Sequence, residues 1–150
     1  MPAVSDLTAH TGYLLRMVSN VVSQEFARKV AGQGVTVAEW AMLRSLYGSD
    51  AIAPSALARK MGMTKGAISK LADRLLEKGL IERTGNTEDK RGHSLSLSPS
   101  GAKAVPVLAG LADENDAAFF AVLSDEDRGL LRGLLQALID KHGLSAVPVD

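Results

Sequence analysis

Residues 63–101 read MTKGAISKLADRLLEKGLIERTGNTEDKRGHSLSLSPSG, and this stretch decides the fold of the chain. Its first part places apolar residues at helical spacing, and Thr64 can cap a helix that runs to Lys78. Gly79 then supplies the turn that ends this helix, because glycine accepts the left-handed conformation. A short β-compatible segment, a polar and basic loop, and an alternation of serine with leucine at 94–98 follow. The stretch therefore predicts a helix followed by a β-hairpin.

A second, shorter helix is predicted directly upstream. Pro54 suits its first turn, Leu57 and Met61 can face inward, and Gly62 ends it. Together with the helix at 64–78, this gives two helices joined by a tight glycine turn. That arrangement is the helix-turn-helix pattern.

Long helical patterns flank this unit on both sides. Residues 6–31 repeat apolar side chains at steps of three, four or seven, and residues 36–48 begin with a capping box of threonine and glutamate. Beyond the hairpin, one helix is expected to begin at 98–100 and a last one at 124–127, with a leucine-rich stripe along 130–139. The chain is therefore expected to be mainly α-helical.

Composition narrows the class of protein. The chain has 150 residues, 46% of them hydrophobic, which is enough for about one globular domain with its own core. It has no cysteine, so disulfides, thiolate metal sites and thiol redox switches are excluded. No stretch approaches the roughly 18 apolar residues of a membrane span, and no signal-peptide pattern occurs. We therefore expect a cytoplasmic protein without a membrane partner.

The net charge is zero, but the charges are unevenly distributed along the chain. Residues 55–103 hold ten lysines and arginines against five aspartates and glutamates, so this part has a net charge of +5 and the rest has −5. Such asymmetry is typical of a chain with one part that faces a polyanion. Solvated basic faces are also common, so charge alone leaves both interpretations open.

The predicted helix at 64–78 has two faces of different chemistry. Ile68, Leu71, Ala72 and Leu75 gather on one side and should pack inward. The other side offers cations, short polar groups and a glycine that permits close approach, which suits a helix in the major groove of DNA. An ordinary surface helix is polar outside as well. The candidates for DNA contact on this helix are Thr64, Lys65, Gly66, Ser69, Lys70 and Arg74.

The loop between the two predicted strands adds a second set of cations. Lys90 and Arg91 lie at its expected tip, and Gly92 allows the turn. The minor groove of DNA is narrow and strongly negative, so a protruding arginine can bind there. Without the neighbouring helix pair, an ordinary solvated hairpin loop would be an equally good interpretation.

Residues 63–101 as a whole resemble the winged helix-turn-helix of the MarR family of bacterial transcription regulators. The letters DKRG at 89–92 match the family's D-x-R-G wing signature, and LSPSG at 97–101 resembles its L-T-x-x-G segment with serine in place of threonine. Upstream, VTVAEW at 35–40 resembles the entry into the family's second helix. The resemblance covers nearly the whole chain.

The resemblance implies a triangular homodimer with interleaved terminal helices and two winged lobes that reach DNA. It places Lys65, Ser69 and Lys70 on the recognition helix and Arg91 at the wing tip, the residues that the helix and loop patterns also select. It leaves open which cation Asp89 orients, Arg74 being one choice and Arg91 the other.

The expected fold is mainly α with a small β-hairpin wing, a winged helix-turn-helix with long N- and C-terminal dimerisation helices. Residues 35–101 would form the DNA-binding lobe, and residues 1–34 and 102–150 the helical dimerisation region. A twofold dimer reads two half-sites about one helical turn apart, so the operator should be nearly palindromic. We expect a sequence-specific regulator, more specifically a repressor of nearby genes.

Many proteins that this chain resembles release DNA when a small aromatic or lipophilic compound enters a pocket between the dimer helices and the lobe. Aromatic residues on amphipathic helices are more often core residues, so a ligand pocket and simple packing both stay open. The three histidines are scattered, and no cluster has metal-ligand spacing, so we expect no metal and no cofactor. The candidates for a ligand pocket are His10, Tyr13, Met17, Trp40 and Tyr47.

Two other classes of function compete with DNA binding. Catalysis is disfavoured because no glycine-rich phosphate loop and no nucleophile motif occur, so we expect no enzyme. The alternative is a winged-helix module that binds protein and not specific DNA, since fold alone does not fix function. Lys65, Lys70, Lys90 and Arg91, cations on both helix and wing, favour DNA.

Overall fold

The computed structural model describes residues 3–85 and 92–145. In chain order the elements are the 3-10 turn η1 (Leu7–Ala9), α1 (Thr11–Ala31), α2 (Val37–Leu46), α3 (Pro54–Met61), α4 (Lys65–Glu77), β1 (Ile81–Thr84), β2 (Ser94–Leu97), α5 (Pro99–Phe120) and α6 (Asp125–Lys141). The expected fold class, helices with one small β-hairpin, is confirmed. Within the two described ranges no helix is both long enough and apolar enough to cross a bilayer.

The first helix differs from its prediction at the N-terminal end. The apolar pattern predicted one helix over 6–31, but α1 begins only at Thr11, after the separate turn η1. His10 between them has an extended backbone, with φ −97° and ψ 121°. Apolar spacing does not detect such a break, because it reports where side chains recur and not whether the backbone is continuous.

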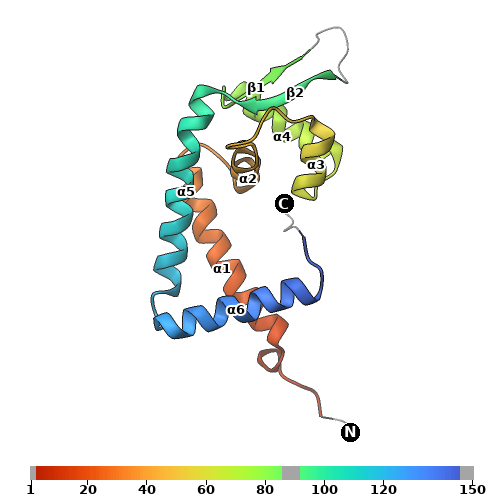
Figure 1. Ribbon diagram of the computed structural model, residues 1–150. Coiled ribbons are helices and arrows are strands. Elements are labelled where there is room, and N and C mark those ends of the chain that lie inside the picture. The colour runs from red at the N-terminus through yellow and green to blue at the C-terminus, as the bar shows by residue number, and fades with distance from the viewer. Residues whose placement is uncertain (1–2, 86–91, 146–150) are drawn as a thin grey trace.

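The elements form a lobe with two long helices leaving it (Figure 1). The hairpin, α2, α3 and α4 make up the lobe, whereas α1 and α5 pack against each other and run away from it. The last helix, α6, turns away from α5 at the end that is far from the lobe (Figure 1).

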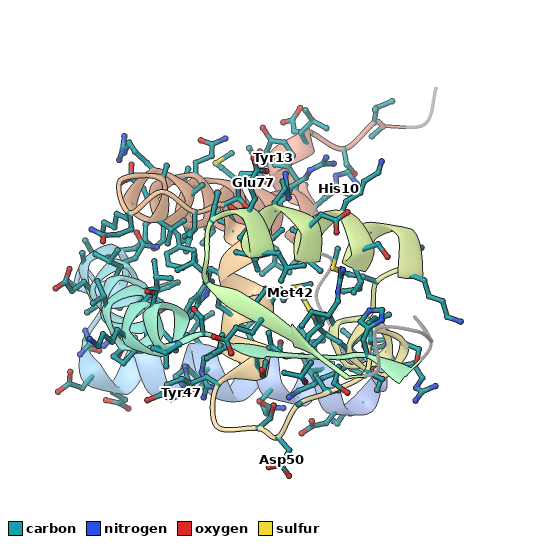
Figure 2. The ribbon with its side chains drawn as sticks, turned by 90° about the horizontal axis from the view of Figure 1, so that it is seen from above. His10, Tyr13, Met42, Tyr47, Asp50 and Glu77 are labelled. Carbon is teal, nitrogen blue, oxygen red and sulfur yellow. The ribbon has the colours of Figure 1, made fainter. Side chains whose placement is uncertain are left out.

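The core lies where α2 is enclosed by the other elements of the lobe and by the near ends of α1 and α5. The residues predicted to face inward from α3 and α4 are all buried there. Met42, which the pattern of α2 did not single out, is fully buried near the centre of the lobe (Figure 2). Among the described residues, the fully buried apolar side chains are Val30, Met42, Leu43, Leu57, Ile68, Leu75, Leu95, Val105 and Leu108.

The hairpin is fastened to the lobe at its base. The strands pair antiparallel, with Ile81 opposite Leu97 and Thr84 opposite Ser94. Ile52, in the segment before α3, exchanges two backbone hydrogen bonds with Leu95, at 3.0 and 2.8 Å. The base of the wing is therefore held by the pairing of the two strands and by the segment that leads into α3.

A buried carboxylate lies at the start of α2. The predicted capping box is present, since the Thr36 hydroxyl accepts from the Glu39 amide at 3.1 Å and Glu39 Oε1 accepts from the Thr36 amide at 2.7 Å. Glu39 is fully buried, and the Lys78 ammonium donates to the same Oε1 at 2.9 Å. Burial acts to raise the pKa of Glu39, but the hydrogen bonds from Lys78 and Thr36 outweigh it, so the pKa lies below its ordinary value.

This lowered pKa predicts a specific loss of stability in acid. A carboxyl group with a folded-state pKa below its unfolded value stabilises the fold above the unfolded pKa, about 4.3, and loses this contribution as the pH falls through the folded pKa. In urea denaturation between pH 6 and pH 3, the wild type should lose more free energy of unfolding than Glu39→Gln, which cannot titrate. If the free energies of unfolding of the two proteins change with pH in parallel, Glu39 does not contribute to the loss of stability in acid.

The long helices leave many apolar side chains uncovered in the single chain. Along α1 only Val30 is buried, and α6 buries none of its residues. The exposed apolar residues of these two helices include Leu14, Leu15, Met17, Val18, Val21, Leu130, Leu134, Leu135, Leu138 and Ile139. Apolar surface on this scale marks an interaction site in a stable protein.

Candidate nucleic-acid interface

The two faces of α4 are arranged as predicted. Ile68 and Leu75 are fully buried, and Leu71 and Ala72 are buried beside them. The opposite face is open to solvent. Its exposed residues are Lys65, Gly66, Ser69, Lys70, Asp73 and Arg74.

The N-terminus of α4 adds to this exposed face. The Thr64 hydroxyl accepts from the Ala67 amide at 3.1 Å, so Thr64 caps the helix and keeps its own O–H as a donor. The first amides of a helix have no intrahelical partner, and the helix dipole is positive at this end. No heavy atom lies within 4 Å of a Cβ added at Gly66. A phosphate or a base edge can therefore approach this end of α4 closely.

The tight turn between α3 and α4 sets the angle of the recognition helix. Gly62 adopts the left-handed conformation with φ 66°, and the Met63 amide donates to the Ala58 carbonyl at 3.0 Å. This ends α3 and lets Thr64 begin α4 two residues later. The helix-turn-helix predicted from Pro54 to Lys78 is thus present.

A cavity of about 470 Å³ lies between α4 and the base of the hairpin. Ser69 and Asp73 line it from α4, and Arg83 and His93 line it from the hairpin. Arg83 Nη2 lies 3.6 Å from Asp73 Oδ1, and both side chains are substantially exposed. Such a pair contributes little to stability. Arg83 does, however, neutralise the negative charge of Asp73 on a face of α4 that otherwise carries cations.

The wing tip falls outside the described residues. This applies to Lys90 and Arg91, and also to Asp89, so the DNA contacts predicted for the tip remain predictions. The described ends of the loop lie close together, since a Cβ at Gly85 would meet the Gly92 carbonyl oxygen at 2.6 Å. Gly85 has φ 130°, a conformation that favours glycine.

A single chain does not gather the five ligand candidates in one place. His10 and Tyr13 lie at the N-terminal end of α1, on the other side of the view from Tyr47 (Figure 2). Trp40 packs edge-on against Phe26 with ring centroids 6.4 Å apart, which is a core contact between α1 and α2. Met17 is exposed on α1. A pocket built from this set would need surfaces of a second chain, and its existence remains a prediction.

Two residues of this region were not selected from the sequence. Arg83 lies two positions after buried Ile81 on the same face of β1, so strand alternation could have placed it toward α4. Lys78 was assigned only as the last residue of a helix, yet it pairs with buried Glu39 across 39 positions. No local pattern predicts a contact over that separation.

Comparison with known proteins agrees with this geometry. The model of the MarR family matches residues 35–93. A transcriptional regulatory protein for the hcr operon of Thauera aromatica is 34% identical over 146 residues, which cover 91% of this chain and 88% of that protein. The HTH-type transcriptional repressor MdtR of Bacillus subtilis is 34% identical over 111 residues, or 73% of this chain and 72% of the repressor.

The fold also matches a solved complex. The crystal structure of a mutant of Escherichia coli MarR complexed with operator DNA superimposes with a TM-score of 0.73 at 26% identity. The match covers 85% of this chain and 92% of that one. Similarity thus extends over the lobe and most of the long helices.

Proposed function

This chain belongs to the MarR family of transcriptional regulators, and we propose that it is a homodimeric repressor of nearby genes that binds a near-palindromic operator in the cytoplasm. The relatives named above are regulators and not enzymes, and we infer the same non-catalytic role here. The observation that carries the proposal is the exposed face of α4. Six solvent-facing candidates, Thr64, Lys65, Gly66, Ser69, Lys70 and Arg74, share that face and its positive end.

The roles of these residues follow from their chemistry. Lys65 and the free amides of the first turn suit a phosphate oxygen, and Gly66 allows the backbone to come close. Ser69 and Lys70 lie one turn further along and suit base edges in the major groove. Arg74 is near the end of the helix, where a phosphate contact is the better fit. Lys90 and Arg91 would extend the contact into the minor groove.

The dimer is supported by the uncovered apolar faces of α1 and α6. Two copies related by a twofold axis would bury these faces and present two α4 helices to two half-sites. We further propose residues 1–34 and 102–150 as the dimerisation region and 35–101 as the DNA-binding lobe. A small aromatic or lipophilic ligand between helices and lobe, near His10, Tyr13, Met17, Trp40 and Tyr47, would release the repressor.

Replacing Lys70 by alanine tests the proposed face of α4. We expect the affinity for the operator to fall by about 1–2 kcal/mol, since one charge-assisted contact is lost. If Lys70 contacts a phosphate, its loss should weaken binding to all DNA sequences equally and lower the slope of log affinity against log salt by about one. A base contact would instead reduce the preference for the operator over unrelated DNA.

The matched control is Arg44→Ala, which removes one exposed cation from α2, a different helix of the same lobe and outside the proposed dimerisation region. Fluorescence anisotropy with labelled operator, at two salt concentrations, measures both variants. Equal losses in the two variants would point to net charge alone and contradict a specific role for α4. Wild-type protein that binds the labelled operator no more tightly than unrelated DNA would favour the protein-interaction alternative.

A further inference from the structure

Four hydrogen bonds meet at the C-terminal turn of α4, residues 78–80. The Lys78 ammonium donates to the Gly34 carbonyl at 2.8 Å and to Glu39 at 2.9 Å. The Ser98 hydroxyl donates to the Gly79 carbonyl at 2.6 Å, and the Ser98 amide donates to the Leu80 carbonyl at 3.1 Å. We call these three residues the α4 joint.

One side of the joint connects α4 to the end of α1. Gly34 lies in the turn that follows α1, and Glu39 lies in the first turn of α2, so the Lys78 ammonium bridges both. Glu39 is fully buried, whereas the Lys78 side chain is 39% exposed. Glu39 Oε2 has no hydrogen-bond partner among the described residues. The buried charge therefore depends strongly on Lys78, because an unpaired carboxylate is costly to bury.

The other side of the joint connects α4 to the start of α5. Ser98 is the N-cap of α5, since its hydroxyl accepts from the Gly101 amide at 3.0 Å. The same hydroxyl donates to Gly79, so one side chain belongs to both helix ends. Figure 2 shows the Glu77 end of α4 directed toward α1 and α5. The two helices that leave the lobe are thus tied to α4 at one turn.

We propose that the α4 joint fixes the orientation of the recognition helix relative to α1 and α5, with Lys78 as its positioning residue. The inference rests on the proposed function, because orientation matters only when two copies of α4 must meet two half-sites at a set distance. Lys78 acts through α4 and is not a DNA contact. A small rotation about this turn moves the exposed face of α4, which changes the spacing and tilt of the two reading helices in a dimer.

The first test measures the free protein and needs no DNA. The chain has no cysteine, so Ser23→Cys on α1 and Ser69→Cys on α4, both exposed, provide two unique sites for spin labels. Diluting the labelled chain in unlabelled wild type leaves mainly distances within one chain. Electron-electron double resonance then reports the distribution of distances between α1 and α4.

We expect Lys78→Met to shift or broaden this distribution and Lys78→Arg to restore it, since arginine can donate to both acceptors. The matched control is Lys60→Met, which removes a lysine that donates to the Ser45 carbonyl at 2.8 Å within the lobe. This control should leave the distribution unchanged. A distribution for folded Lys78→Met that overlays the wild type overturns the proposal.

A second variant covers the case in which Lys78→Met does not fold. Glu39→Gln/Lys78→Met removes both charges, so no carboxylate is left buried without a cation. The proposal predicts the same broadened distances in this protein. A folded double variant with wild-type distances contradicts it.

The second test uses operator DNA with one base pair inserted between the half-sites. The wild type should bind the operator with the insertion more weakly than the original operator. In Lys78→Met the ratio of these two affinities should fall by about twofold to thirtyfold. Lys60→Met should keep the wild-type ratio. If the wild type shows no preference for any operator, but the distances between α1 and α4 depend on Lys78, the proposed function is refuted. The role of the α4 joint in orienting α4 is then still supported. If Lys78→Met keeps both the wild-type distances between α1 and α4 and the wild-type preference for the operator without the insertion, the proposed role of the α4 joint is refuted. The proposed function is not affected by that result.

Discussion

Gly101→Ala is expected to destabilise the fold by at least about 3 kcal/mol, which corresponds to a fall in Tm of roughly 6–12 °C for a chain of this size. Gly101 is buried in the first turn of α5. A Cβ there would lie 2.0 Å from the Leu80 carbonyl oxygen and 3.3 Å from Leu97 Cδ2. The clashing oxygen belongs to the backbone at the end of α4, so it cannot rotate away as a side chain would. Relief would require α5 to move away from α4.

The control for this prediction lies in the same helix. A Cβ added at Gly110 has no heavy atom within 4 Å, so Gly110→Ala meets open space in the chain. Alanine favours the helix over glycine, so this variant should gain about 0.5–1 kcal/mol. Thermal and urea unfolding compare both variants with the wild type. Similar stabilities for the two alanine variants would mean that α5 does not pack against the α4 joint as described.

Replacing both Leu134 and Leu138 by aspartate should convert the protein to monomers and weaken operator binding by at least about 100-fold. These leucines lie on one face of α6 and are 57% and 48% exposed in the single chain. Two charges on that face would be buried without partners in a dimer. Each lobe alone would then read one half-site, and the gain from linking two lobes would be lost. The fold of the lobe should survive, because α6 buries no residue within the chain.

Sedimentation and gel shifts measure the two parts of this prediction. The double variant should sediment near the chain mass of 15.8 kDa, and the wild type near twice that mass. Gln136→Asp puts one charge on the opposite, polar side of α6 and should leave both mass and affinity close to wild type. A double variant that stays dimeric would place the dimer interface elsewhere. A monomeric wild type would contradict the homodimer itself.

Most of the fold could be predicted because the deciding signals are local. Gly62 and Gly79 end helices in the left-handed conformation, and Thr36, Thr64 and Ser98 cap helices through side-chain hydrogen bonds. These signals act within about four or five residues, so both partners of each contact lie close together in the sequence. The two faces of α4 follow from helical periodicity for the same reason.

The contacts that position α4 could not be predicted, because their partners are far apart in the chain. Glu39 was expected to complete a capping box, and nothing local indicates that it is buried against Lys78. In the sequence Gly101 is only the last residue of the LSPSG segment, whereas in the structure it allows the close approach of α5 to Leu80. The break at His10 was missed because the pattern of apolar residues continues across it.

In the proposed function, the exposed face of α4 directs this protein to a specific operator. The most direct test is a gel-shift titration of the purified protein against DNA from upstream of its own gene, beside unrelated DNA, at two salt concentrations. We expect tight binding to the upstream DNA that weakens steeply with salt and exceeds binding to unrelated DNA. Equal binding to both DNAs at both salt concentrations would contradict the proposed function.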